Sequence, residues 1–252
     1  MILIRINSMP HTYGKQVLIL GASGAIGHAL TRLLIHDPEV ATIFAASRRG
    51  IQNANSKITQ LYIDCENEES LAKAVEQCRQ AGPLDMVINA IGLLQDGNSL
   101  MPEKGLRDIR SENLKKLFWL NSIVPALIMT HFTPLMAQDR RTIFATLSAR
   151  VGSIGDNRKG GWYGYRASKA ALNQLIKTAS IELAFRRPKL ICVGLHPGTV
   201  RSRMSEPFLT HYNNNDIFSP EFAAQALLDV LATLTPSHSG RIFAWDGQEI
   251  PP

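Results

Sequence analysis

The chain has 252 residues, of which 45% are hydrophobic and 19% are charged, and its formal net charge is +6. This length is sufficient for one large α/β domain with a substantial core. The moderate positive charge fits a mildly basic surface or attraction to a nucleotide phosphate. Because the sequence has no basic arm, we expect no nucleic-acid binding.

Short apolar runs alternate with helical patterns along the chain. Residues 1–15 lack a signal-peptide core, so we interpret them as an N-terminal extension and residues 16–252 as one domain. Most of the apolar runs are continuous, as expected for parallel strands covered on both faces. The predicted strands are 16–20, 42–47, 61–64, 85–90, 142–148, 190–195 and 241–245. Seven strands with helical crossovers predict an α/β fold, a doubly wound parallel sheet of the Rossmann type with helices on both faces.

The first predicted strand leads directly into the segment GASGAIG, residues 21–27, and then into an amphipathic helix. A glycine-rich turn in this position lets backbone N–H groups and a helix N-terminus face a pyrophosphate. We expect Gly21 to form the tight turn, Gly24 to allow close approach of the ligand, and Gly27 to let the helix pack on the sheet. The predicted dinucleotide-binding loop comprises Gly21, Ser23, Gly24, Ala25, Ile26 and Gly27.

The end of the second predicted strand indicates which dinucleotide binds. A carboxylate at this position would accept hydrogen bonds from the adenosine ribose of NAD. The chain instead has Ser47, Arg48 and Arg49. Arginine can hold a 2′-phosphate that a carboxylate would repel, although an arginine pair can also be a solvated feature of a surface turn. We therefore expect NADP(H) as the cofactor.

Several motifs occur in an order that resembles the short-chain dehydrogenase/reductase family. They are GASGAIG, Asp64, NAIG at 89–92, Asn121, the serine region at 148, YRASK at 165–169 and HPGTVRS at 196–202. The resemblance covers about residues 16–250 and is closest to the C-factor-like and sniffer-type carbonyl reductase branch. It implies a reductase of aldehydes, ketones or quinones.

The resemblance also implies roles for individual residues. Asp64 is similar to the acid beside the adenine, Ile91 replaces a usual glycine, and Asn121 matches an asparagine that holds a water in the proton path. The residues implied to lie beside the adenosine ribose are Asn89, Ala90 and Ile91, and those implied to hold the nicotinamide amide are Pro197, Gly198, Val200 and Ser202.

Two tyrosines, Tyr163 and Tyr165, precede Lys169. Only Tyr165 has the Tyr-x-x-x-Lys spacing, and residues four apart share one helix face, ~6 Å apart along the axis. Tyr163 lies six residues from the lysine, so we expect it to be a packing or lid-contacting aromatic. We expect the ammonium of Lys169 to lower the pKa of Tyr165 and to hold the nicotinamide ribose. Tyr165 would then donate a proton to the substrate carbonyl.

The family also uses a serine at the end of the fifth strand to hydrogen-bond the substrate carbonyl. Aligned through residues 152–154, that position falls on Ala149, and Ser148 is its neighbour. Because successive strand residues point to opposite faces, Ser148 could serve only where the strand end is twisted, bulged or already loop. We assign the role to Ser148, with Ser153 as one alternative and no assisting serine as the other.

The segment 199–219 has weak periodicity and a polar tract, so we expect a long loop, of the kind that often forms a lid. The three cysteines lack CxxC spacing and the histidines lack metal-binding patterns, which predicts no metal site and no disulfide. No apolar run approaches the ~20 residues that span a bilayer. We expect a cytoplasmic protein with a small-molecule partner and no membrane partner.

We further expect a homodimer that pairs through the helix after Tyr165 and through a helix spanning about 103–131. A protein of a different class also fits the motifs, namely a dinucleotide-binding signalling or sensor protein with weak reductase activity, because a fold does not determine a function.

Overall fold

Seven parallel strands form the central sheet of the protein, in the order β3-β2-β1-β4-β5-β6-β9. The computed structural model describes residues 14–52, 54–97, 99–211 and 213–252, so nearly all of the N-terminal extension expected at 1–15 lies outside the described residues. The strands are β1 (Lys15–Leu20), β2 (Val40–Ser47), β3 (Ile58–Tyr62), β4 (Met86–Asn89), β5 (Thr142–Leu147), β6 (Leu190–His196) and β9 (Ile242–Ala244). The predicted doubly wound parallel sheet is confirmed.

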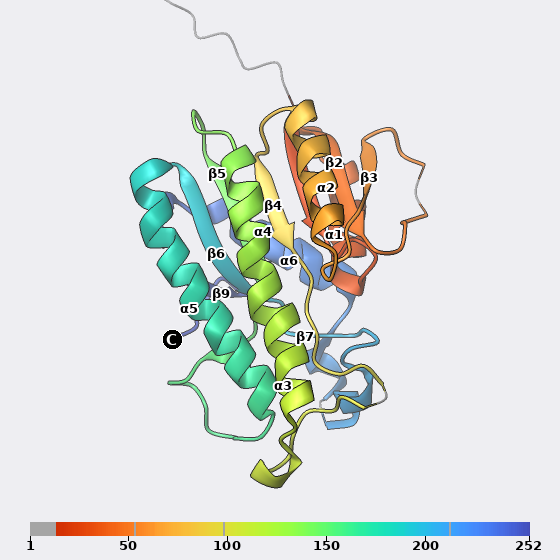
Figure 1. Ribbon diagram of the computed structural model, residues 1–252, viewed down its shortest axis with the longest axis vertical. Coiled ribbons are helices and arrows are strands. Elements are labelled where there is room, and N and C mark those ends of the chain that lie inside the picture. The colour runs from red at the N-terminus through yellow and green to blue at the C-terminus, as the bar shows by residue number, and fades with distance from the viewer. Residues whose placement is uncertain (1–13, 53, 98, 212) are drawn as a thin grey trace, which may run out of the picture.

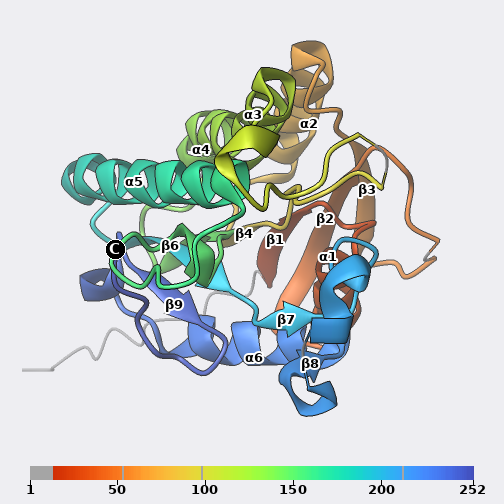
Figure 2. The same cartoon turned by 90° about the horizontal axis from the view of Figure 1, so that it is seen from below.

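Helices cover both faces of this sheet, as Figures 1 and 2 show. The helices on one face are α2 (Glu68–Ala81), α3 (Ser111–Phe118), α4 (Val124–Phe132) and α5 (Tyr163–Arg186), and those on the other are α1 (Ala25–Ile35) and α6 (Pro220–Thr233). Strand order reverses between β1 and β4, and ligands of open α/β sheets bind at such a switch point, outside the carboxyl ends of the strands.

Strand β1 shows why the apolar runs are continuous rather than alternating. Val17 and Ile19 belong to the hydrophobic cluster that includes α1 and α6, whereas Leu18 and Leu20 belong to the cluster under α2, α4 and α5. All four side chains are fully buried. A strand covered on both faces needs apolar residues at every position, and this pattern therefore places β1 in the centre of the sheet.

Two segments differ from the sequence-based expectation. The helix expected over about 103–131 begins only at Ser111 and contains a π-helical turn, Trp119–Ile123, between α3 and α4. The loop expected over 199–219 contains two short parallel strands, β7 (Thr199–Val200) and β8 (Ile217–Phe218), which periodicity cannot detect at two residues each. The 3-10 turns are Leu106–Asp108, Thr133–Leu135, Arg150–Gly152, Glu206–His211, Asn214–Asp216 and Pro236–His238.

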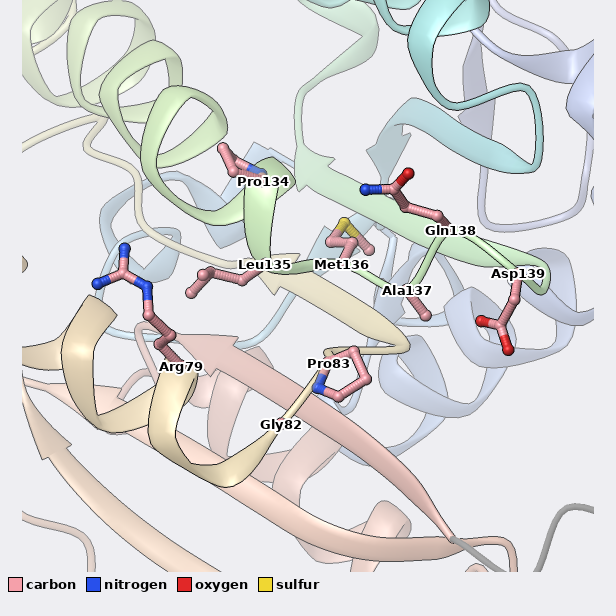
Figure 3. Close-up of a pocket in the computed structure, with 9 residues that line it drawn as sticks. All are labelled: Arg79, Gly82, Pro83, Pro134, Leu135, Met136, Ala137, Gln138 and Asp139. Atoms are coloured by element: carbon pink, nitrogen blue, oxygen red, sulfur yellow. The ribbon is translucent and has the colours of Figure 1, made fainter.

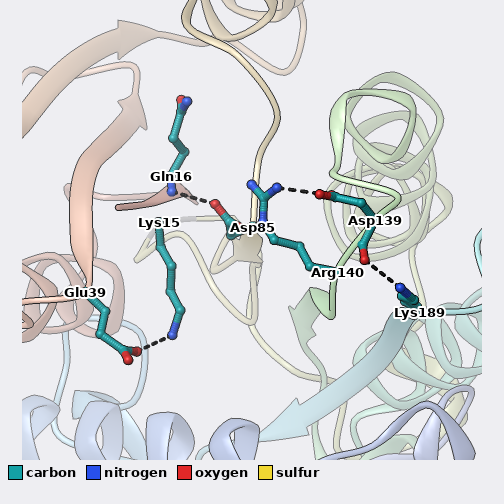
Figure 4. A network of polar contacts seen from close by, with 7 residues as sticks. All are labelled: Lys15, Gln16, Glu39, Asp85, Asp139, Arg140 and Lys189. Carbon is teal, nitrogen blue, oxygen red and sulfur yellow. Dashed lines mark hydrogen bonds and ion pairs between the residues drawn. The ribbon is translucent and has the colours of Figure 1, made fainter. Parts of the chain in front are cut away.

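The amino-terminal ends of the strands carry polar groups that fix their positions. Asp85 is 8% exposed and accepts hydrogen bonds from the backbone N–H of Gln16 (2.9 Å) and from Nε of Arg140 (2.5 Å). Lys15 and Glu39 form a separate, exposed ion pair beside them (Figure 4). The Asp85 carboxylate thus ties the start of β1 to the segment that leads into β5.

A shallow pocket also lies at this end of the sheet. It is formed by the C-terminal end of α2 and the segment 134–139, with Arg79 and Asp139 at its rim (Figure 3). Its lining contains none of the predicted site residues, which come from the opposite, carboxyl edge of the sheet. This pocket is therefore separate from the candidate active site.

Replacing Asp85 with alanine should lower the free energy of unfolding by about 2 kcal/mol, because the change removes a charged hydrogen bond and leaves a backbone N–H without its acceptor. Chemical denaturation monitored by circular dichroism measures this loss. Glu39→Ala is the matched control in the exposed pair and should have no measurable effect. If both variants lost the same free energy of unfolding, the buried carboxylate of Asp85 would contribute no more to stability than the exposed carboxylate of Glu39.

Candidate active site

The loop after β1 has the geometry expected of a phosphate-binding turn. Gly21 has a φ of 80°, in the left-handed region that glycine adopts readily, and forms the turn. A Cβ on Gly27 would lie 2.2 Å from the carbonyl oxygen of Gly21, so only glycine lets α1 pack this closely. Gly24 is exposed and is the N-cap of α1, with no side-chain cap. The first turn, with Ala25 and Ile26, therefore leaves its N–H groups available to an anion.

The end of β2 carries two exposed arginines and no carboxylate. Arg48 and Arg49 are both exposed, whereas Ser47 is 9% exposed and its hydroxyl donates to the carbonyl oxygen of Arg49. Asp64 follows β3, and its side chain accepts a hydrogen bond from the N–H of Glu66 (3.2 Å). The serine thus shapes the turn, and no hydrogen bond or ion pair with another described residue engages either guanidinium group.

The residues after β4 hold the backbone of the switch point in place. Asn89 is fully buried; its Nδ2 donates to Thr146 (2.9 Å), and its Oδ1 accepts from the N–H of Ile91 (3.1 Å). The Asn89 side chain is therefore engaged within the protein, and any contact with a ribose would come from the neighbouring backbone. The backbone N–H of Ala90 donates to Leu20, which joins this turn to β1.

The segment after β6 leads from the sheet into the lid segment, which we define as residues 199–219. Gly198 has a φ of 76°, and a Cβ there would lie 2.5 Å from the Phe218 ring. Val200 is buried, and the backbone N–H of Ser202 donates to Ser205 (3.1 Å). One folded turn at the carboxyl edge of the sheet therefore contains Pro197, Gly198, Val200 and Ser202.

Tyr165 and Lys169 meet on one face of α5, as their spacing predicts. The Lys169 Nζ atom lies 5.9 Å from the centre of the Tyr165 ring and donates a hydrogen bond to the carbonyl oxygen of Leu147 (2.8 Å). Among the described residues, the half-buried Tyr165 has no partner for its hydroxyl. The phenol is thus available to a ligand, and the lysine fixes the helix to the end of β5.

Asn121 lies in the π-helical turn, which directs its side chain at the loop after β4. Its Oδ1 accepts from the N–H of Leu93 and its Nδ2 donates to the carbonyl oxygen of Leu93, both at 2.8 Å. A Cβ on Gly92 would lie 3.4 Å from Asn121 Oδ1 and 3.5 Å from Lys169 Nζ, so the asparagine and the lysine approach the same point of the loop. Single π turns of this kind are frequent at functional sites.

Burial favours the neutral form of each titratable group at the centre of this site. It raises the pKa of Tyr165 to about 12 and lowers the pKa of Lys169 to about 7. Burial, assisted by the charge of Arg150, also lowers the pKa of His196 to about 4. Burial thus moves the pKa of Tyr165 upward, opposite to the lowering expected from the charge of Lys169.

Within the described part of the chain, neither candidate serine forms a hydrogen bond with Tyr165. The Ser148 hydroxyl donates to Oδ1 of Asn173 (2.5 Å), and the Ser153 hydroxyl donates to the carbonyl oxygen of Pro252 (3.3 Å) and accepts from the N–H of Asp156 (3.0 Å). Ala149 is extended, with φ −155° and ψ 147°, and buried. The assignment of Ser148 stays a prediction, and these contacts favour the alternative in which no serine assists.

The last residue of the chain supports the loop that follows β5. The Pro252 carbonyl oxygen accepts hydrogen bonds from the backbone N–H of Gly155 (3.0 Å) and from the Ser153 hydroxyl (3.3 Å). Ile250, two residues earlier, is buried in the core cluster on the α5 side. The C-terminal residues thus hold the loop between Ala149 and the start of α5.

The sequence analysis did not identify two residues that shape this site. Trp162, directly before α5, contacts both Tyr165 and Phe208 of the lid segment, which is the role we had expected for Tyr163. Gln95 donates from Nε2 to the carbonyl oxygen of Arg203 (2.8 Å) and joins the lid segment to the loop after β4. Two glycines before Trp162 mark an unusual turn in the sequence, whereas nothing in the sequence marks Gln95.

The comparisons with known proteins agree with this geometry. The family model for short chain dehydrogenase matches residues 15–213, which is more than half of the chain. The chain belongs to the short-chain dehydrogenase family. This short-chain dehydrogenase is 33% identical over 68% of its length to C-signal of Myxococcus xanthus, covering 93% of that protein. It is 30% identical over 92% of its length to the 1-hydroxy-2-glutathionyl-2-methyl-3-butene dehydrogenase of Rhodococcus sp. (strain AD45), covering 97% of it.

Solved structures share the fold of this short-chain dehydrogenase. The carbonyl reductase Sniffer of D. melanogaster superposes with a TM-score of 0.83 at 23% identity, covering 95% of this chain and all of that one. An NADPH-bound carbonyl reductase from chicken fatty liver superposes with a TM-score of 0.81 at 21% identity, covering 95% of this chain and 99% of that one. The predicted short-chain dehydrogenase/reductase family is confirmed, and the protein is an NAD(P)-dependent oxidoreductase.

The described residues contain neither a membrane-spanning helix nor a metal-binding cluster. No helix among them is both long and apolar enough to cross a membrane. Residues 14–252, apart from 53, 98 and 212, contain no group of three side chains that could hold a metal ion.

Proposed function

We propose that this short-chain dehydrogenase is an NADPH-dependent carbonyl reductase in which Tyr165 donates the proton. The observation that carries the proposal is the open hydroxyl of Tyr165 beside Lys169, at the carboxyl edge of the sheet. The pKa of Tyr165, about 12, keeps the phenol protonated at neutral pH, as a proton donor requires. Turnover of NADPH with a panel of aldehydes, ketones and quinones tests the activity.

The residues present fit a dinucleotide. The uncapped first turn of α1 suits a pyrophosphate, and the exposed Arg48 and Arg49 suit a 2′-phosphate. When bound, NADPH supplies the hydride. Lys169 would hold the nicotinamide ribose, and Asn121 would keep the loop after β4 in place beside it. Tyr165 would hydrogen-bond the carbonyl oxygen of the substrate and transfer its proton to it.

A second candidate function is a dinucleotide-binding signalling or sensor protein with weak reductase activity. The observation that favours it is Ala149, where the family has a serine, together with the internal hydrogen bonds of Ser148 and Ser153. One missing hydrogen bond to a developing oxyanion costs on the order of 10²-fold in rate. Slow turnover with every carbonyl in the panel would support this second function.

The arginine pair leads to a prediction about cofactor choice. NADPH should bind at least about tenfold more tightly than NADH, because two guanidinium groups can pair with the 2′-phosphate. Fluorescence titration of both cofactors measures the ratio. The double variant Arg48→Ala/Arg49→Ala should lose the preference, while the control Arg107→Ala, at an arginine whose side chain is 94% exposed, should keep it. Equal affinities in the wild type would refute the assignment.

We also propose a homodimer that pairs through α5. Ile181 and Phe185 are four residues apart on this helix, on one face, and are 54% and 86% exposed. Large apolar side chains grouped in this way suit an interface between subunits. Sedimentation should therefore give a dimer at micromolar concentration, and Phe185→Lys should shift it to a monomer. A monomeric wild type would contradict the proposal.

A further inference from the structure

Three aromatic rings meet at the candidate proton donor, two from the start of α5 and one from the lid segment. The Trp162 ring packs edge-on against Tyr165, with centroids 6.2 Å apart, and at a tilt against Phe208 of the lid segment, with centroids 5.2 Å apart. All three side chains are half-buried, so part of each ring remains accessible. Trp162 therefore stands between the proton donor and the lid segment, where the remainder of a carbonyl substrate would lie.

The backbone of Trp162 is held in an unfavourable conformation. Its φ is 52°, and it follows Gly160 and Gly161, whose φ angles are 62° and 64°. Glycine adopts this left-handed region freely, but a bulky residue rarely does. Such a conformation persists only where the surrounding structure enforces it, and these conformations cluster at ligand sites. The aromatic ring is thus placed by the protein rather than by local preference.

The contacts that enforce this conformation come from Glu103. Its carbonyl oxygen accepts a hydrogen bond from the N–H of Trp162 (2.6 Å), and its Oε2 accepts from the N–H of Gly164 (3.1 Å). The side chain is 2% exposed, and its Oε1 has no hydrogen-bond partner among the residues that the structure describes. A carboxylate at the N-terminus of α5 is favourable with the helix dipole. Glu103 therefore holds the backbone on both sides of Trp162.

We propose that Trp162 is the specificity-determining residue of the carbonyl pocket, that Glu103 positions it, and that together they select flat aromatic carbonyl compounds. The inference rests on the proposed reductase function. A planar ring attached to the carbonyl can stack or pack edge-on against Trp162 and Phe208, whereas a puckered aliphatic ring of similar size cannot. Glu103 acts through Trp162 and does not touch the substrate.

The test compares benzaldehyde with cyclohexanecarbaldehyde, which have six-membered rings but differ in planarity. For each variant, kcat/KM with the first aldehyde is divided by kcat/KM with the second, so that intrinsic reactivity cancels between variants. We expect Trp162→Leu to lower this ratio by about three- to tenfold, and Trp162→Phe to retain most of it. Tyr163→Leu, at the neighbouring exposed aromatic, is the matched control and should leave the ratio unchanged.

Glu103 is tested by two replacements. Glu103→Gln keeps a side-chain oxygen for the N–H of Gly164 and should retain the ratio, whereas Glu103→Ala should lower it as Trp162→Leu does. A general loss of structure would lower the activity towards both aldehydes and leave their ratio unchanged. If Glu103→Ala, which keeps the backbone carbonyl that binds Trp162, retains the wild-type ratio, the Glu103 side chain has no positioning role.

A measurement without turnover separates this inference from the proposed function. The affinities of benzyl alcohol and cyclohexylmethanol for the protein loaded with NADPH, a combination that has no hydride acceptor, give a second ratio, determined by calorimetry. If the wild-type protein reduces neither aldehyde, the reductase function is contradicted. The binding ratio then tests the role of Trp162 without any measurement of turnover. If Trp162→Leu changes neither the turnover ratio nor the binding ratio, the inference is overturned.

Discussion

Replacing Tyr165 with phenylalanine should lower the rate of carbonyl reduction by about 10²- to 10⁴-fold, the usual contribution of a positioned general acid. The change removes only the hydroxyl and keeps the ring that packs against Trp162. NADPH affinity should therefore be nearly unchanged. Steady-state turnover and fluorescence titration of NADPH, on the same preparation, measure the two effects.

The control for this prediction is Tyr163→Phe, which should be close to neutral because that side chain is 37% exposed and contacts neither Lys169 nor the lid segment in any of the described aromatic or polar contacts. Because the pKa of Tyr165 is about 12, the donor stays protonated between pH 6 and pH 9, so a change of turnover in this range would report the titration of Lys169, whose pKa is about 7. If Tyr163→Phe lost turnover and Tyr165→Phe kept it, the proton donor would be Tyr163.

Introducing a serine at position 149 should raise carbonyl turnover, by up to about 10²-fold. The resemblance to the family places its serine at this position, where the chain has a buried Ala149. The new hydroxyl would donate a hydrogen bond to the carbonyl oxygen as negative charge develops on it. Ala149→Ser is measured as kcat with saturating NADPH, and Ala149→Cys, of similar size but with a thiol that is only a weak donor, is the control.

The same experiment decides the role of the native serines. Ser148→Ala and Ser153→Ala should retain nearly full activity, because both hydroxyls already bond within the protein. A loss of about 10²-fold in Ser148→Ala alone, with no gain in Ala149→Ser, would instead show that Ser148 turns from Asn173 towards the substrate.

Local spacing accounts for the parts of the site that the sequence predicts. The three-residue spacing of Gly21, Gly24 and Gly27 specifies a turn and a helix start, and the structure has both. The four-residue spacing of Tyr165 and Lys169 places the two on one helix face, and they meet there. Each of these predictions depends only on backbone geometry within a few residues.

The parts that the sequence does not predict depend on burial and on distant contacts. The direction of the Tyr165 pKa shift depends on desolvation, which no local pattern reveals. Glu103 lies 61 residues before Gly164, and the two meet only because α3 and α5 pack against each other. The short strands β7 and β8 exist only because Thr199 and Ile217 become neighbours in the fold.

The contact between Pro252 and the loop after β5 makes the rigidity of that loop depend on residues far away in the sequence. The Pro252 carbonyl oxygen is the acceptor for the N–H of Gly155 and for the Ser153 hydroxyl, and Ile250 anchors this segment in the core. Strand β9, at the edge of the sheet, leads directly into these residues. A change that displaced residues 250–252 would therefore loosen the loop between Ala149 and the start of α5 without touching any residue of the candidate active site.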